Sequence, residues 1–178
     1  MPEIVPLDRS HDRTGFDCGV PELNAFLKAT ARQHGQKGIS RSFVLTDGGP
    51  AILGFFTLAL CEISAELLPA AQARAYPLHA LPAVRLARLG VSRKMQGMGF
   101  GELLLAEAIH RTALIAEQAG VIGLFVDAKN ESAKHFYQRY GFFVIPEHPL
   151  QLFLPIQTIL AVDANSSLPQ PYHSHATQ

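Results

Sequence analysis

Three glycines at alternate positions, Gly97, Gly99 and Gly101, separate two regular segments of this chain. Residues 84–91 are mostly apolar, which predicts a strand, and residues 97–118 repeat apolar side chains at helical spacing. Glycine inside a helix costs stability, so three of them at its start need another reason. Without side chains, their N–H groups can gather around one anion at the helix N-terminus, where the helix dipole also favours negative charge. The turn therefore predicts a pyrophosphate site, and tight packing of strand on helix is the alternative.

Two other phosphate-binding loops do not fit this turn. A dinucleotide fold needs G-x-G-x-x-G, and a nucleotide-triphosphate loop needs G-x-x-x-x-G-K followed by Ser or Thr. This chain has G-x-G-x-G, placed mid-chain after a predicted hairpin. Arg93 and Lys94 precede the turn and would help to hold phosphate, unless they belong to a solvated turn.

The remaining periodicities predict one α/β domain. We expect helices over 20–34, 97–118 and 132–140, and strands over 42–45, 51–63, 84–91, 121–126, 142–145 and 151–159. The turn Asp47-Gly48-Gly49-Pro50 joins the first two strands into a hairpin, and the Pro-bearing segment 64–82 is a connection. Two strand–helix–strand crossovers in the second half imply a mixed central sheet with helices on both faces. We expect this domain to span residues 1–160 and residues 161–178 to be a mobile polar tail.

Composition excludes several classes of protein. The chain has 178 residues and a formal net charge of +0, which argues against a surface coated in basic charge. Its two cysteines show no disulfide or C-x-x-C pattern, and its eight histidines include no H-x-x-x-H pair, so we expect no metal. The first residues have no apolar signal region and no apolar run is long enough to span a membrane. We expect a cytoplasmic protein without a membrane segment.

The glycine turn also carries a family resemblance. Gln96-x-x-Gly99-x-Gly101 resembles the acetyl-CoA loop of the GNAT superfamily of N-acetyltransferases. The resemblance implies a GNAT-type domain that uses acetyl-CoA as co-substrate. It assigns cofactor binding to a set of residues on the strand, the turn and a later loop: Leu89, Gly90, Val91, Arg93, Gln96, Gly97, Met98, Gly99, Phe100, Gly101 and Asn130.

A second motif runs from Asn130 to Phe142 and is similar to the GNAT pattern of an Asn after a strand, a short helix with a Tyr, and Gly-Phe. In that family the Tyr points at the sulfur of CoA, so the resemblance assigns Tyr137 as general acid. A phenol with a pKa of about 10 is protonated at neutral pH and can donate to the departing thiolate. The resemblance places a main-chain oxyanion donor near residues 89–91. Asn130 could instead merely cap the helix, and Tyr137 could be a core aromatic.

The first fifty residues resemble the opening of the GNAT toxins of bacterial toxin–antitoxin pairs. Phe16-Asp17-Cys18-Gly19-Val20-Pro21 and the following residues to Leu27, then Arg41-Ser42-Phe43-Val44-Leu45, carry this likeness, which covers residues 4–157. Those toxins acetylate the α-amine of aminoacyl-tRNA and so block translation. The resemblance also implies a small ribbon-helix-helix antitoxin as partner and a homodimer.

The absence of an obvious base favours the same acceptor. Glu62 is the nearest candidate carboxylate, and an exposed strand-end residue is an equally good interpretation of it. A lysine side chain, with a pKa of about 10.4, needs a base, whereas an α-amine with a pKa of about 8 is substantially neutral already. The motifs therefore suit an α-amine better than a lysine side chain.

Transfer RNA also requires cations. We expect a phosphate-binding surface from five basic residues, Arg32, Lys37, Arg41, Arg85 and Arg88, if folding brings them to one face. Scattered solubilising charge is the alternative. Two other functions also stay open: a GNAT enzyme acting on a small amine, peptide or protein N-terminus, and a non-catalytic module that retains the fold.

Overall fold

The structure is a computed structural model, and it describes residues 1–165. A mixed seven-stranded sheet runs through the whole described chain, with the strand order β1-β2-β3-β4-β5-β7-β6. The strands are β1 (Glu3–Pro6), β2 (Arg41–Thr46), β3 (Gly54–Ser64), β4 (Ala80–Val91), β5 (Gly123–Asp127), β6 (Phe143–Ile145) and β7 (His148–Pro155). Only β4 and β5 pair in parallel, and every other neighbouring pair is antiparallel.

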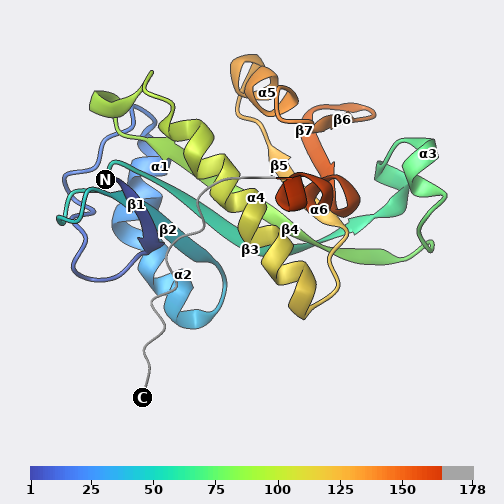
Figure 1. Cartoon of the computed structure of the whole chain (residues 1–178), viewed down its shortest axis with the longest axis horizontal. Coiled ribbons are helices and arrows are strands. Elements are labelled where there is room, and N and C mark those ends of the chain that lie inside the picture. The colour runs from blue at the N-terminus through green and yellow to red at the C-terminus, as the bar shows by residue number, and fades with distance from the viewer. Residues whose placement is uncertain (166–178) are drawn as a thin grey trace.

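One helical segment lies between β1 and β2, and further helices follow strands in the second half of the chain. They are α1 (Pro21–Ala25), which continues through a π-helical stretch (Phe26–Thr30) into α2 (Ala31–Lys37), then α3 (Ala70–Ala73), α4 (Phe100–Gln118), α5 (Glu131–Gln138) and α6 (Ile156–Asn165). Short 3-10 turns cover Ala65–Leu67 and Arg93–Met95. Figure 1 shows α4 and α6 lying across one face of the sheet, with α3 at the far end of the long β3–β4 pair.

The two faces of the sheet bury different clusters because side chains alternate along a strand. Leu104 and Leu105 of α4 pack with Phe56 of β3 in the main core. Phe26 and its neighbours in the helix that begins at α1 pack with Phe55, the preceding residue of the same strand, in a separate cluster. The expected α/β architecture with helices on both faces is confirmed.

Most expected elements are present within a few residues, and one is wrong. The last strand was expected to continue to Ile159, but it ends at Pro155 and α6 begins at Ile156. Ile159 is fully buried in the main core under this helix. A short apolar run does not distinguish a strand from a buried helix by periodicity, which explains the error. Strand β1 was not anticipated.

Helix α6 also covers residues 161–165, which were assigned to the polar tail. The rest of that expected tail, residues 166–178 with His173 and His175, lies outside the described residues. The domain boundary at residue 160 therefore stays a prediction.

Candidate active site

A cleft opens where two parallel strands separate. β4 and β5 pair only over Val84↔Leu124, Arg85↔Phe125 and Leu86↔Val126. Directly after Leu86, β4 contains a β-bulge: Leu86 faces Leu58 and Arg88 faces Thr57, so Ala87 has no opposite residue on β3. A bulge bends its strand and increases the local twist. The backbone of residues 87–91 therefore leaves β5 and presents N–H and C=O groups that no strand pairs on that side.

The cleft has a volume of about 660 Å³ and four walls. One wall is β4 from Leu86 to Val91, and another is the end of β5. The start of α5, from Asn130 to Tyr137, closes the third side, and the segment before and within α1, from Cys18 to Leu23, closes the fourth. Gln96 lies at the end of the cleft that leads to α4.

The glycine turn has the backbone conformation that its sequence requires. Gly97 and Gly99 have φ angles of 77° and 84°, in the left-handed region that favours glycine. Gly99 is the N-cap of α4 and has no side chain that could cap the helix. The first N–H groups of this helix therefore have no side-chain cap. A side-chain carbon built at Gly97 would meet nothing within 4 Å. The helix start therefore combines free amides, a dipole and open space, which is the physical requirement for an anion site.

Gln96 joins this turn to the cleft. Its side-chain Nε2 donates to the carbonyl of Cys18 and to the carbonyl of Val91, each at 3.0 Å. The backbone N–H of Arg93 donates to the carbonyl of Asp17 at 2.9 Å. These bonds hold the segment before α1, the end of β4 and the glycine turn in one arrangement.

Tyr137 is brought to the same cleft from the other side. Its ring is only 7% exposed and packs edge-on against Phe136 and Phe142, with ring centroids 5.2 and 5.5 Å away. Tyr137 nevertheless lines the cleft, and its hydroxyl has no hydrogen-bond partner among residues 1–165. Burial raises its pKa from 10.0 to about 12. The phenol is therefore protonated throughout the neutral range and is free to donate into the cleft.

Comparison with known proteins agrees with this arrangement. The model of the acetyltransferase (GNAT) domain matches residues 38–144. The chain belongs to the GNAT acetyltransferase family. It is 34% identical to the probable toxin TacT of Sinorhizobium fredii over 88% of this chain and 92% of that protein. It is 35% identical to the tRNA-acetylating toxin of Mycobacterium tuberculosis over 80% of this chain and 85% of that protein. Among solved structures, AtaT complexed with acetyl-methionyl-tRNAfMet has a TM-score of 0.85 and 32% identity, covering 91% of this chain and 99% of that chain.

Two residues assigned to the GNAT cofactor site have other partners in the free protein. Asn130 is the N-cap of α5, and its Oδ1 accepts from the N–H of Ala133 at 2.9 Å, so the capping role is confirmed. Asn130 also lines the cleft, and its side-chain amide nitrogen makes no hydrogen bond within residues 1–165. Arg93 points instead to Asp17, with Nε and Oδ2 3.6 Å apart, and both side chains are exposed. Arg93 is not among the residues that line the cleft.

The five basic residues expected to meet on one face are divided among different places. Arg88 lines the GNAT cleft, and its guanidinium lies 4.5 Å from the centre of the Phe26 ring. Burial lowers the pKa of this guanidinium, the nearby charge of Arg85 adding to the effect, and its NH1 donates to the carbonyl of Ala87 at 2.8 Å. Arg85 forms an ion pair with Asp127, a cleft residue, at 2.5 Å.

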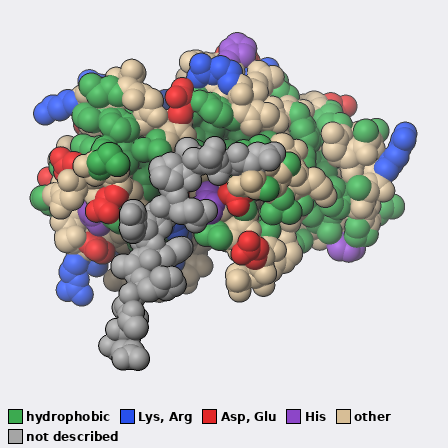
Figure 2. Space-filling model, viewed as in Figure 1, with side chains coloured by type: hydrophobic (Ala, Val, Ile, Leu, Met, Phe, Trp, Pro, Cys, Tyr) green, Lys and Arg blue, Asp and Glu red, His purple; other side chains and the backbone are tan. Residues whose placement is uncertain are grey.

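Arg32 and Arg41 line a separate pocket of about 250 Å³ between β1, α2 and β2, together with Arg9, which sequence reasoning did not select. Lys37 is exposed at the end of α2. On the face covered by α4 and α6, Lys and Arg side chains lie apart from one another rather than in one patch (Figure 2). The five expected cations therefore do not form one surface. Arg88 lies in the cleft, Arg32 and Arg41 lie in a separate small pocket, and Arg85 and Lys37 lie elsewhere.

Glu62 is not a base for this site. It is exposed, and it pairs in register with Pro82 on the distant part of the β3–β4 pair. The acidic residues that do line the cleft are Glu22 and Asp127, which the motifs did not select. Their place in the cleft depends on contacts between distant segments, so no local sequence pattern could have identified these two residues.

Two kinds of feature were not found within residues 1–165. None of the helices has the length and the apolarity needed to cross a bilayer. No group of three or more His, Cys, Asp or Glu side chains is arranged to hold a metal ion.

Proposed function

We propose that this chain transfers the acetyl group of acetyl-CoA to the α-amine of an aminoacyl-tRNA and so acts as the toxin of a toxin–antitoxin pair. The observation that carries this proposal is one cleft that Tyr137 lines and that extends to Gln96, the residue directly before the glycine turn at the uncapped start of α4. The relatives support the substrates: AtaT is solved with acetyl-methionyl-tRNAfMet, and the AtaTR complex is solved with acetyl-CoA.

The residues suggest a division of roles for acetyl-CoA. The amides of residues 97–101 hold the pyrophosphate at the start of α4. The unpaired edge of β4 after Leu86 offers N–H and C=O groups to the amide-containing arm of CoA, and one N–H among residues 89–91 stabilises the oxyanion. The side-chain amide nitrogen of Asn130 is available to the same arm.

The chemistry balances without a metal. The amine nitrogen attacks the thioester carbon, and collapse of the tetrahedral intermediate breaks the C–S bond. Tyr137 donates its proton to the departing thiolate. Because the pKa of Tyr137 is about 12 and that of a thiol is about 8.5, this transfer is unfavourable unless the phenolate regains a proton. The proton that the nitrogen loses on becoming an amide supplies it, so Tyr137 ends the reaction protonated.

The acceptor follows from the weakness of the available bases. Asp127 is paired with Arg85, and Glu22 is exposed. Neither is a buried carboxylate of the kind that would serve as a strong base for a lysine side chain. An α-amine esterified through its carboxyl group is already substantially neutral at pH 7, so it needs no such base.

Solved complexes of related toxins support the assignment of this chain to a toxin–antitoxin pair. AtaT is solved bound to the C-terminus of the antitoxin AtaR, and KacTA is solved with DNA. We propose a ribbon-helix-helix antitoxin and a homodimer for this chain, acting in the cytoplasm where charged tRNA is found. Arg88 in the cleft and the pocket of Arg9, Arg32 and Arg41 supply cations for tRNA phosphates.

The test is incubation with acetyl-CoA and total charged tRNA, followed by mass spectrometry of the released aminoacyl adenosines. We expect N-acetylated aminoacyl adenosine with the wild-type chain and almost none with Tyr137→Phe. A parallel reaction with free amines and with peptides bearing a free N-terminus examines the other acceptors. Acetylation of those acceptors without acetylated aminoacyl adenosine would refute the tRNA substrate and leave the family assignment intact.

A further inference from the structure

One wall of the cleft includes backbone that belongs to no regular element. Residues 16–20 form neither a helix nor a strand, and Cys18 and Val20 line the cleft. The N–H and C=O groups of such a segment need partners from elsewhere, because no strand ladder or helical turn supplies them. The position of this wall therefore depends on the groups that hold its backbone.

The backbone of Cys18 is held on both sides by side-chain amides. Its N–H donates to Oδ1 of Asn24 at 2.9 Å, and its carbonyl accepts from Nε2 of Gln96 at 3.0 Å. Asn24 belongs to α1, and Gln96 directly precedes the glycine turn, so the two amides reach Cys18 from distant parts of the chain. We call Asp17, Asn24 and Gln96 the Cys18 clamp.

Asp17 completes the clamp. Its Oδ1 accepts from the N–H of Gly19 and from Nδ2 of Asn24, each at 2.9 Å. The bond from Gly19, with the bond from Asn24 adding to it, lowers the pKa of Asp17, so this carboxylate is ionised at neutral pH and accepts both bonds. Asn24 therefore uses both ends of its amide, one on the Cys18 backbone and one on Asp17.

The clamped wall lies directly against the middle of β4. A side-chain carbon built at Gly90 would be 3.4 Å from Sγ of Cys18 and 3.4 Å from a methyl carbon of Leu23. The absence of a side chain at Gly90 is what permits this close approach. Residues 89–91 are also the stretch proposed to supply the oxyanion N–H. The position of the wall therefore sets the space beside the reacting carbonyl, where a shift of about 1 Å is enough to impair a reaction.

This wall belongs to the acceptor side of the cleft. The residues proposed to hold acetyl-CoA lie on β4, at the start of α5 and at the glycine turn, and none lies in residues 18–23. Cys18 and Leu23 pack with Phe55 on the sheet face opposite α4, whereas Tyr137 packs in the main core with α4. The thioester lies between these two sides, so an amine reaches it past residues 18–23.

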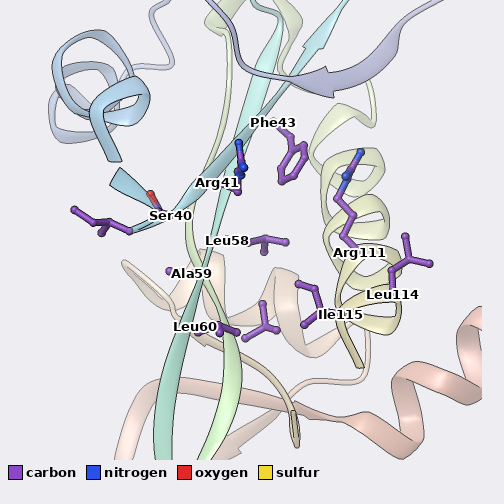
Figure 3. Close-up of a pocket in the computed structure, with 12 residues that line it drawn as sticks. Ser40, Arg41, Phe43, Leu58, Ala59, Leu60, Arg111, Leu114 and Ile115 are labelled. Carbon is purple, nitrogen blue, oxygen red and sulfur yellow. The ribbon is translucent and has the colours of Figure 1, made fainter. Parts of the chain in front are cut away.

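The open groove on the α4 face does not offer another route for the amine. It has a volume of about 350 Å³, and Phe43 and Leu58 form its floor beside Arg111 and Ile115 of α4 (Figure 3). None of the residues that line this groove also lines the cleft. An amine bound there would be separated from the thioester by the sheet.

We propose that Asn24 is a positioning residue for acetyl transfer: its amide holds Cys18, and with it the acceptor wall of the cleft, against β4. Asn24 is not among the residues that line the cleft, so it acts through Cys18. When Asn24 is lost, Gln96 still bonds the carbonyl of Val91 and keeps the glycine turn in place. Acceptor use should therefore fall while acetyl-CoA binding is retained. That the acceptor is an aminoacyl-tRNA rests on the proposed function, whereas the wall acts in the same way on any amine.

Alkylation of Cys18 measures the position of the wall without acetyl transfer. The purified full chain is treated with iodoacetamide, and peptide mass spectrometry follows each cysteine separately. Cys18 is 6% exposed, and Cys61, which is half-buried on β3, is the internal reference for general unfolding. We expect Asn24→Ala to raise the rate at Cys18 by about tenfold or more and to leave the rate at Cys61 unchanged. Gln118→Ala is the matched control and should change neither rate, because it removes an exposed amide that does not line the cleft.

Kinetics then separate the acceptor from the cofactor. In Asn24→Ala, kcat/KM for aminoacyl-tRNA should fall by about tenfold or more, and the dissociation constant for acetyl-CoA should stay within about twofold. Asn24→Asp keeps an acceptor for the Cys18 N–H but places a second carboxylate opposite Asp17, so it should also lower kcat/KM. Adding Asp17→Asn removes one of the two facing charges and should recover most of the activity.

The two assays distinguish failure of the clamp from failure of the proposed acceptor. A wild-type chain that acetylates no aminoacyl-tRNA refutes that acceptor. The kinetics then use whichever free amine or peptide is acetylated, and the alkylation rates decide the role of Asn24 in either case.

Three results would overturn the proposal. The first is an unchanged rate at Cys18 in Asn24→Ala. The second is an equal rise at Cys18 and Cys61, which would make Asn24 a general stabiliser of the fold. The third is a loss of acetyl-CoA affinity as large as the loss of acceptor use. If Asn24→Ala does not fold, Asn24→Asp with and without Asp17→Asn decides the question, and a failure of Asp17→Asn to restore activity refutes the clamp.

Discussion

Replacing Tyr137 by Phe tests two separate properties: the effect of burial on the ionisation of the phenol, and the role of the hydroxyl as a proton donor. Ionising this phenol in the folded protein is disfavoured, because burial raises its pKa from 10.0 to about 12. The unfolded chain ionises near pH 10, so between about pH 10 and 12 the folded state binds more protons and stability falls as pH rises. At about pH 11 the loss is about 1.4 kcal/mol, and it approaches about 2.7 kcal/mol above pH 12.

The assay is urea unfolding of wild type and Tyr137→Phe at about pH 8 and about pH 11. Phe cannot ionise, so the variant should gain about 1.4 kcal/mol relative to the wild type between the two conditions. Comparing the two proteins cancels the titration of every other group. If both lose the same stability over this range, Tyr137 is not buried as described.

The same substitution tests the chemistry. Tyr137→Phe removes the proton donor and should lower the acetylation rate by about 100-fold or more, with the dissociation constant for acetyl-CoA retained. Tyr140→Phe is the matched control: it removes a hydroxyl two residues after the end of the same helix, and Tyr140 does not line the cleft. Full activity in Tyr137→Phe, or equal losses in both variants, would refute the general-acid role.

Three further substitutions test the local geometry. Gly99→Ala places a side chain at a φ of 84° and should cost about 1 kcal/mol of unfolding free energy in a urea titration, and weaken acetyl-CoA binding by calorimetry; unchanged values would contradict the anion site. Asn130→Ala removes the cap on α5 and should cost about 1 kcal/mol, whereas Asn130→Asp should retain most of it; equal losses in the two would argue against capping. Ser40→Ala removes an unpaired buried hydroxyl and should stabilise the free chain by about 1 kcal/mol in thermal unfolding, so a loss would mean that Ser40 has a partner.

The sequence by itself determined the parts of this protein that depend on local chemistry. The long helix follows from its apolar period, although it begins at Phe100 and not at the expected Gly97, because Gly97 and Gly99 adopt left-handed conformations. The family followed from two short motifs with fixed spacing. Each of these signals lies within one segment, so no contact between distant residues was needed to detect it.

Where the pattern was ambiguous, local reasoning failed or left alternatives open. Residues 156–159 have the apolar composition of a strand, yet they form a helix because Ile159 packs in the main core beside α4. Asn130 was compatible with two roles, and only the position of the Ala133 N–H distinguished its cap. The role of Glu62 was undecided until its strand register placed it far from the cleft.

Only the tertiary structure decided how these parts form a site. The bulge at Ala87 separates β4 from β5, and that separation depends on pairing with β3, more than twenty residues earlier in the chain. The same folding brings the segment 18–23 against α5 and divides the arginines between the cleft and a separate pocket. It also leaves Leu60 and Ser40 in an open groove. Strand pairing and side-chain packing join residues that are remote in the chain, and a single sequence carries no local record of which residues will meet.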